Sequence, residues 1–304
     1  MYQCSEDINF YHDFLHKKDY NLFNMWLMYA LLSGIFYTGS GLIIRHILKK
    51  DKSDAWAFSF FFSVIGALIS LPFMVSNFKV SGSIIPWVVV FIIGWLIVGQ
   101  NYFNLTSSKY ISASINGSIT KFRLVWVMIL GIIILRESSS LLKIGGTLLT
   151  VVSGTIIIKN LTQPKNIKGV IYAFGATLFY AIVIITYKYL FKYFNSQSLT
   201  FFIFFIPALI NLSIIPDSVK RIFSLAKNQL RIVFIACALS GFANLAMNQG
   251  LALGEVSKVV VIIESFLVVT LIGENIILKE KENIATKIFA VISATIGAVL
   301  IRIS

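Results

Sequence analysis

The chain has 304 residues, 57% hydrophobic and only 13% charged, with a net charge of +13. A soluble domain carries about twice that charged fraction, and the mean hydropathy is +0.84, so a soluble globular domain is excluded. Lys and Arg gather in short segments between apolar runs, where they set membrane topology and meet anionic lipid. The positive charge therefore indicates a membrane protein with no nucleic-acid partner.

Apolar runs recur from residue 25 onward, after a polar tail (1–24) that lacks the features of a secretory signal peptide. Each run has roughly 20 residues, enough for a helix to cross a hydrocarbon core of about 30 Å. The ten predicted spans fall at residues 25–46, 54–76, 84–105, 111–135, 141–158, 168–191, 197–216, 230–252, 255–279 and 284–302. We therefore expect an all-α integral membrane protein with ten transmembrane helices, which form two five-helix units at 25–160 and 168–302.

The two units are related by a repeat with an offset of 143 residues. "YALLSGIFYTGSGLIIRHILKK" (29–50) aligns with "YAFGATLFYAIVIITYKYLFKY" (172–193), and polar positions match as well as apolar ones. Five spans per unit is an odd number, so the two copies must cross the membrane in opposite orientations. Such inverted repeats are a transporter architecture, with the binding site near the membrane midplane where the halves meet.

An acidic residue closes the fourth span of each unit: Glu137 in "IILRESSS" and Glu280 in "IILKEKEN". With the two five-span units of about 140 residues and the short fifth span that follows each of these acids, the chain resembles the drug/metabolite transporter superfamily, of the EamA type. The resemblance implies a secondary transporter that moves small metabolites by alternating access, often amino acids or related compounds.

Lys121 and Arg123 lie near the middle of the predicted fourth span, without an acid nearby in sequence. A Lys or Arg at the centre of a spanning helix costs about 2.5–3.5 kcal/mol and usually faces a cavity or a partner. The offset of 143 places Lys121 on Glu264, so we predict that these two side chains face each other across a central cavity. They form either a permanent salt bridge or a site for a zwitterion, with the cations on its carboxylate and Glu264 on its ammonium.

Arg123 follows Lys121 by two residues, which corresponds to about 200° around a regular helix. Both side chains can line one cavity only if the helix is bent or unwound, and "NGS" at 116–118 makes Asn116 a candidate for that bend and for the site. Otherwise Arg123 faces a neighbouring helix.

Four further residues are candidates for the substrate site. Tyr37 and Tyr180 occupy equivalent positions on the first and sixth spans and either cover the cavity or pack between helices. Asn101 and Asn244 are also equivalent and lie at membrane depth. Amides there either contact a ligand or hold helices together, so both roles stay open.

The sequence predicts neither an enzyme nor a metal or cofactor site. We expect secondary transport of a small polar metabolite, and the preferred substrate is an amino acid or related zwitterion. One alternative is a nucleotide-sugar or organic-phosphate carrier. Another is a non-transporting membrane sensor or assembly protein. A coupling proton or counter-substrate and a homodimeric partner are also compatible with the pattern. We expect a bacterial inner (plasma) membrane location with both termini on one side. The sequence leaves open which side of the membrane the termini face, because the distribution of Lys and Arg and the family resemblance indicate opposite sides.

Overall fold

The computed structural model describes residues 25–44, 55–110, 116, 119–156, 167–214, 218–266 and 284–304; the predicted tail at 1–24 lies outside these ranges. Every regular element within them is a helix. In chain order they are the helix Met25–Ile44, α2 (Ala55–Ser76), α3 (Ile84–Tyr110), a short helical segment at 119–121, α5 (Arg123–Leu135), α6 (Leu141–Ile156), α7 (Ile167–Leu190), α8 (Ser196–Ile214), α9 (Ser218–Leu253), a helix at 256–266 and α11 (Ile284–Ile303).

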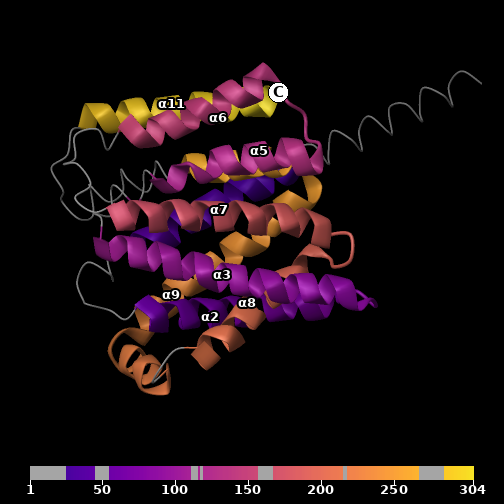
Figure 1. Cartoon of the computed structure of the whole chain (residues 1–304), viewed down its shortest axis with the longest axis vertical. Helices are drawn as coiled ribbons and strands as arrows, with labels where there is room; N and C mark the ends of the chain where they lie inside the picture. The colour runs from indigo at the N-terminus through magenta and orange to yellow at the C-terminus, as the bar shows by residue number, and fades with distance from the viewer. Residues whose placement is uncertain are drawn as a thin grey trace, which may run out of the picture.

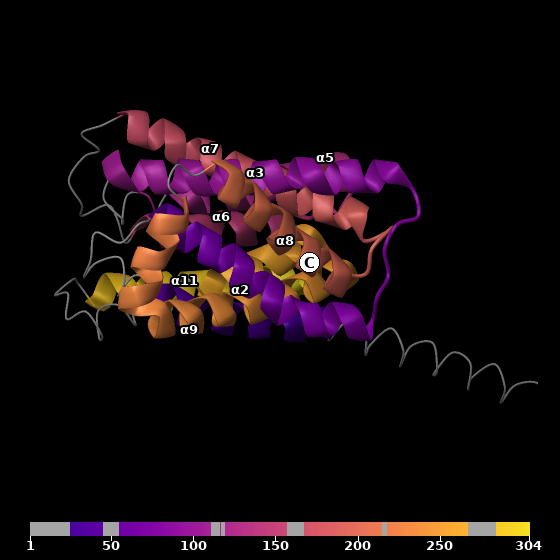
Figure 2. The same ribbon diagram turned by 90° about the horizontal axis from the view of Figure 1, so that it is seen from below.

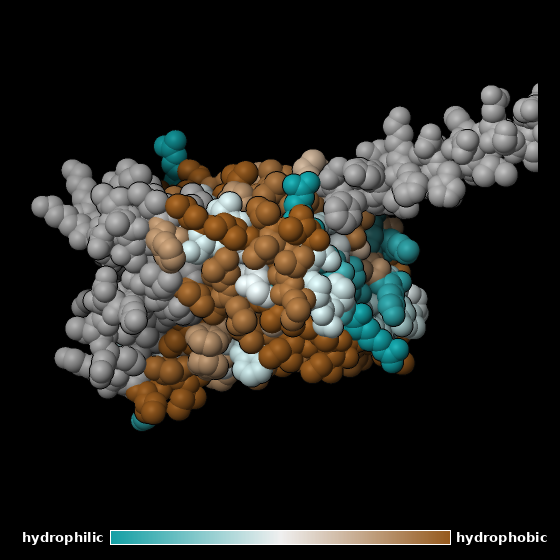
Figure 3. Space-filling model, turned by 90° about the horizontal axis from the view of Figure 1, so that it is seen from above, coloured by the Kyte–Doolittle hydropathy of each residue, from teal (hydrophilic) through white to brown (hydrophobic). Residues whose placement is uncertain are grey.

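Six of the described helices are long and apolar enough to cross a membrane: Met25–Ile44, Trp56–Ser76, Ile84–Asn104, Ile167–Leu190, Ser196–Ile214 and Leu230–Leu253. Their outward faces carry large apolar side chains, such as Leu68, Trp95 and Leu209. Figure 3 shows this apolar surface along the side of the bundle, with hydrophilic atoms gathered at one end. A helix satisfies its own backbone groups without water, so these segments suit a lipid environment and the chain is an integral membrane protein.

The helices run side by side and pack mainly across the two halves of the sequence (Figures 1 and 2). α3 packs against α7, α2 against α8 and α9, and α5 against α7. At one edge of the bundle α6 lies along α11. A core of buried apolar side chains joins these layers, with Leu124, Ile184 and Leu251 nearly inaccessible.

Helix boundaries recur at the offset found in the sequence. α3 ends at Tyr110 and α9 ends at Leu253, while α6 begins at Leu141 and α11 at Ile284. Each pair of positions is 143 residues apart. The α9 helix nevertheless begins at Ser218, well before residue 230 where the eighth span was predicted to start. Residues 218–229 are too polar to have been identified as part of a span, yet they continue the same helix.

Two glycines allow the close approach of α6 and α11. A Cβ atom on Gly146 would lie 2.6 Å from the carbonyl oxygen of Gly297, and a Cβ on Gly297 would lie 2.7 Å from the carbonyl oxygen of Gly146. Without a hydrophobic driving force in lipid, membrane helices associate through such small-residue contacts. The contact explains why this pair packs backbone to backbone.

Replacing Gly146 by Ala should therefore destabilise the protein by about 1–3 kcal/mol, the usual cost of overpacking. Gly145→Ala is the matched control, because a Cβ at Gly145 meets nothing within 4 Å. Thermal unfolding of both variants in detergent measures the difference. Equal melting temperatures would show that the helices can separate at no cost.

Candidate functional site

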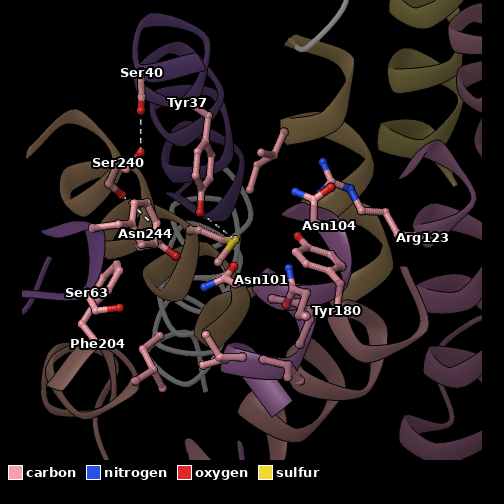
Figure 4. Close-up of a pocket in the computed structure, with 18 of the residues that line it drawn as sticks. Tyr37, Ser40, Ser63, Asn101, Asn104, Arg123, Tyr180, Phe204, Ser240 and Asn244 are labelled. Carbon is pink, nitrogen blue, oxygen red and sulfur yellow. Dashed lines mark hydrogen bonds between the residues drawn. The ribbon is translucent and has the colours of Figure 1, made fainter. Parts of the chain in front are cut away.

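A cavity of about 420 Å³ lies between helices from both halves of the chain (Figure 4). Its walls come from the helix Met25–Ile44, α2, α3 and α5, and from α7, α8, α9 and the helix at 256–266. This volume is near the lower end of the range of about 300–1,000 Å³ for small-molecule sites. At this volume the cavity has the size of a small metabolite. Among the described residues no group of three or more His, Cys, Asp or Glu is placed to hold a metal ion.

Three charged side chains meet at one wall of this cavity. Arg123 pairs through Nη2 with Oε1 of Glu264, and Nζ of Lys121 lies 3.5 Å from Oε2. The predicted contact between the equivalent positions 121 and 264 is therefore present. The side chains of Lys121 and Glu264 are 6% and 3% exposed, whereas that of Arg123 is 21% exposed. Arg123 is thus the cation that reaches the cavity.

Lys121, the first of the predicted ligand-binding cations, lies beside the cavity and is not among the residues that line it. Its Nζ also donates to the backbone carbonyl of Glu264 at 3.2 Å. The ammonium of Lys121 therefore contacts both the carboxylate and the backbone carbonyl of Glu264, and it holds this residue in place. The cavity itself is lined by Glu264 and Arg123, among other residues.

An interruption of the helix brings Lys121 and Arg123 to one carboxylate. The N–H of Phe122 donates to the carbonyl of Ile119 at 3.0 Å, three residues back instead of four, and α5 begins at Arg123. This tighter turn and the length of both side chains let them share Glu264. Of the "NGS" segment predicted to bend, Asn116 is helical and residues 117–118 lie outside the described part of the chain, in which the interruption falls at Phe122.

The two predicted tyrosines both line the cavity. The guanidinium carbon of Arg123 lies 4.7 Å from the ring centroid of Tyr180, a cation–π contact that orients the guanidinium. The Tyr37 hydroxyl donates weakly to Sδ of Met247 at 3.9 Å. Figure 4 shows Tyr180 beside Arg123, with Tyr37 on another wall.

Two of the three predicted asparagines line the cavity. Nδ2 of Asn101 donates to Ser59 Oγ at 3.2 Å, and Nδ2 of Asn244 donates to the Ser240 carbonyl at 2.9 Å. Asn116 is buried away from the lining. It accepts a hydrogen bond from Ser107 and donates to Oδ1 of Asn104 at 3.0 Å. Its role is therefore to position Asn104.

The sequence analysis missed several polar residues of the lining, among them Ser40, Asn104 and Ser240. The hydroxyls of Ser40 and Ser240 lie 2.5 Å apart and join the helix Met25–Ile44 to α9. These three residues each lie three or four positions from a predicted one, on the same helix face. Helical periodicity applied to Tyr37, Asn101 and Asn244 would have identified them.

A second polar cluster closes one end of the bundle, here called the sealed end. It is the end where the connections 77–83, 136–140 and 191–195 lie, at the right of Figure 1. Nζ of the fully buried Lys143 lies 3.2 Å from Oε2 of Glu137 and 2.8 Å from Oε2 of Glu255. Nδ2 of Asn195 donates to the carbonyl of Asn77 at the same end. These contacts tie connections of both halves together.

The sealed end also satisfies the free ends of two helices. Glu137 accepts hydrogen bonds from the N–H groups of Val256 and Ser257, which begin the helix at 256–266. Lys188 donates to the carbonyls of Leu251 and Gly254 at 2.8 Å each, where α9 ends. A carboxylate at a helix N-terminus and an ammonium at a C-terminus are both favourable. The acid that suggested the family resemblance is therefore a helix cap.

The fold and the sequence have recognisable relatives. The sequence model described as the EamA-like transporter family matches residues 24–159 and again 167–303. A solved structure described only as "Crystal structure of protein" is similar over 91% of this chain and 96% of its own, with a TM-score of 0.72 and 10% identity, which shows a shared fold alone. No curated protein matches the chain. Members of the matched family are membrane transporters of the drug/metabolite type, not enzymes.

Replacing Lys143 by Met should strongly destabilise the protein, because two acids would lose the buried cation they share. Breaking a buried ion pair typically costs about 3–5 kcal/mol. Lys192→Met, at an exposed position near the same end, should leave stability unchanged. Unfolding in detergent followed by circular dichroism tests the pair. A Lys143→Met protein as stable as the control would show that the cluster contributes nothing.

Proposed function

We propose, since the chain belongs to the EamA-like transporter family, that it is a secondary transporter that carries a small polar metabolite through the central cavity by alternating access. The observation that supports this most is the buried charge cluster of Lys121, Arg123 and Glu264 at the cavity wall. Ionisable groups inside a membrane are costly and mark substrate pathways. A structural bridge alone would need one cation rather than two.

In this proposal the transporter has ten membrane-spanning helices, arranged as two inverted five-helix units. Helix ends recur 143 residues apart, and the equivalent residues Lys121 and Glu264 contact each other. Equivalent positions meet where they lie next to a two-fold axis. A binding site near the midplane of such a repeat is the arrangement that alternating access requires.

The state in the structure is closed at the sealed end, and we place the route to the cavity at the opposite end. The lining extends to Ile44, the last described residue of the helix that begins beside the sealed end at Met25. Trp26 packs against Gly254 there. Transport then requires the contacts of Lys143 with Glu255 and of Asn195 with Asn77 to open.

The size of the cavity favours a small substrate over a nucleotide sugar. An amino acid or related zwitterion places its carboxylate on Arg123 and its ammonium over the aromatic rings of Tyr37 or Tyr180. A small organic acid or phosphate is the second candidate, because two cations share one carboxylate at the site. A coupling proton or a counter-substrate completes the cycle, and the location proposed is the bacterial inner membrane.

Transport itself is tested by reconstituting the purified protein into liposomes and measuring counterflow with a panel of amino acids and small organic phosphates. Saturable counterflow is expected of a carrier and not of a sensor or assembly protein. Arg123→Gln should reduce it by more than tenfold, since losing a buried charge partner costs about 2–5 kcal/mol. Arg136→Gln, at an exposed position after the same helix, is the control. Absence of counterflow from folded parent protein would refute the proposal.

Opening of the sealed end is tested with one cysteine in the cavity. In a protein with Cys4 and Cys237 replaced by Ser, Ser63→Cys should react with a small membrane-impermeant thiol reagent from the opposite end only. Adding Glu255→Gln weakens the seal by removing a charge from Lys143. Labelling through the sealed end should then rise roughly five- to 30-fold, as expected for 1–2 kcal/mol. The control Lys192→Gln should leave the labelling rate unchanged. If Glu255→Gln also leaves it unchanged, the contacts of Lys143 do not close the sealed end.

A further inference from the structure

The central charge cluster has an excess of positive charge. Lys121 and Arg123 each carry +1 and Glu264 carries −1, and Glu264 is the only acidic residue among the described residues that line the cavity. An uncompensated charge at membrane depth is costly, by about 2.5–3.5 kcal/mol on insertion scales. A ligand that brings one negative charge into the cavity removes this cost.

Arg123 keeps hydrogen-bond donors available for such a ligand. Its side chain lines the cavity and is 21% exposed, and its Nε, which is buried in this state, makes no hydrogen bond. Glu264 engages the guanidinium through Nη2, while Lys121 lies next to the other carboxylate oxygen. A guanidinium has five N–H donors in a planar fork that fits carboxylate or phosphate oxygens. Figure 4 shows Asn104 on the same side of the cavity as Arg123, where its amide adds a further polar contact.

Glu264 is poorly placed to receive an ammonium group. Both of its oxygens already face a cation, and its side chain is only 3% exposed. A ligand ammonium would have to displace Lys121 or Arg123 and would be repelled by the one that stayed. The hypothesis that Glu264 binds the ammonium of a zwitterion is therefore the less favourable of the two predicted arrangements.

We infer that the site binds a small organic anion, through a carboxylate or phosphate group held by Arg123, and that Lys121 sets the charge of the site without touching the ligand. The inference rests on the proposed transport function and favours its second substrate candidate, a compound with a net negative charge, over the zwitterion. Lys121 faces the second carboxylate oxygen of Glu264, so Glu264 engages Arg123 through Nη2 alone and the rest of the guanidinium is left for the anion. Lys121 is thus a positioning residue that determines specificity.

The experiment compares compounds that share a skeleton and differ in charge. Thermal stabilisation of the purified full-length protein is titrated with lactate against alanine, 2-hydroxyisocaproate against leucine, and phenyllactate against phenylalanine, since stabilisation follows ligand concentration over affinity. Glycerol 3-phosphate against glycerol forms the phosphate arm. We expect at least one anion to bind about tenfold or more tightly than its zwitterionic or neutral partner, a difference of about 1.4 kcal/mol. Which arm responds distinguishes a carboxylate from a phosphate substrate.

Variants with opposite effects on the site charge give the second readout. Lys121→Met brings the cluster to neutrality and should abolish the preference for the anion. Lys121→Arg keeps the positive charge and should therefore keep the preference. Glu264→Gln raises the charge of the cluster and should keep or increase anion binding. If Glu264 instead receives an ammonium, Glu264→Gln would eliminate amino-acid binding and Lys121→Met would not change the ranking of the compounds.

The parent protein decides the matter even if a variant fails to fold. Amino acids that bind as tightly as their hydroxy-acid partners, or an absence of stabilisation by every anion, would overturn the inference. Saturable counterflow of another solute in the same preparation would then leave the transport function intact, so the two failures can be told apart.

Discussion

The structure depends on holding a carboxylate in the middle of a bundle that is otherwise apolar. Glu264 is stable there only because two cations face it, and both come from one short segment of the other half of the chain. This requirement accounts for the tight turn at Phe122 and for the aromatic face of Tyr180 against Arg123. Desolvating charges is expensive even when they are paired, so the bridge is a poor source of stability and a good means of placing a guanidinium.

The same physics produces a different outcome at the sealed end. Lys143 is fully buried, yet it faces two acids and also donates to the carbonyl of Ser138 at 2.9 Å. Glu137 is further saturated by the backbone at the start of the helix at 256–266. Polar groups whose partners are all present rigidify a structure. The central cluster differs because Arg123 retains an unpaired donor, which is why we assign the ligand to this cluster and the closure to the other.

The sequence alone was sufficient to predict the pairing of Lys121 with Glu264, because a constant offset relates equivalent positions of a repeat. It was insufficient for the sharing of Glu264 by Arg123, since the turn at Phe122 occurs without a Pro or Gly at that position and arises from local backbone hydrogen bonding. The sequence was also insufficient to predict that the Asn116 side chain faces Asn104 and not the cavity. Whether an amide faces a cavity or a neighbouring amide depends on how helices are rotated against one another, and hydropathy carries no information on that rotation.

The contact of Gly146 with Gly297 constrains which parts of the protein can move as rigid bodies. It joins the last helix of the first half, α6, to the last helix of the second half, α11, with no side chain between the two backbones. Sliding these helices apart would open a gap that lipid tails cannot fill. The pair therefore forms one close contact that the two halves of the sequence share. In the transport cycle proposed above, the bodies that pivot are the remaining helices, so the mechanical division of the molecule differs from the division of its sequence into repeats.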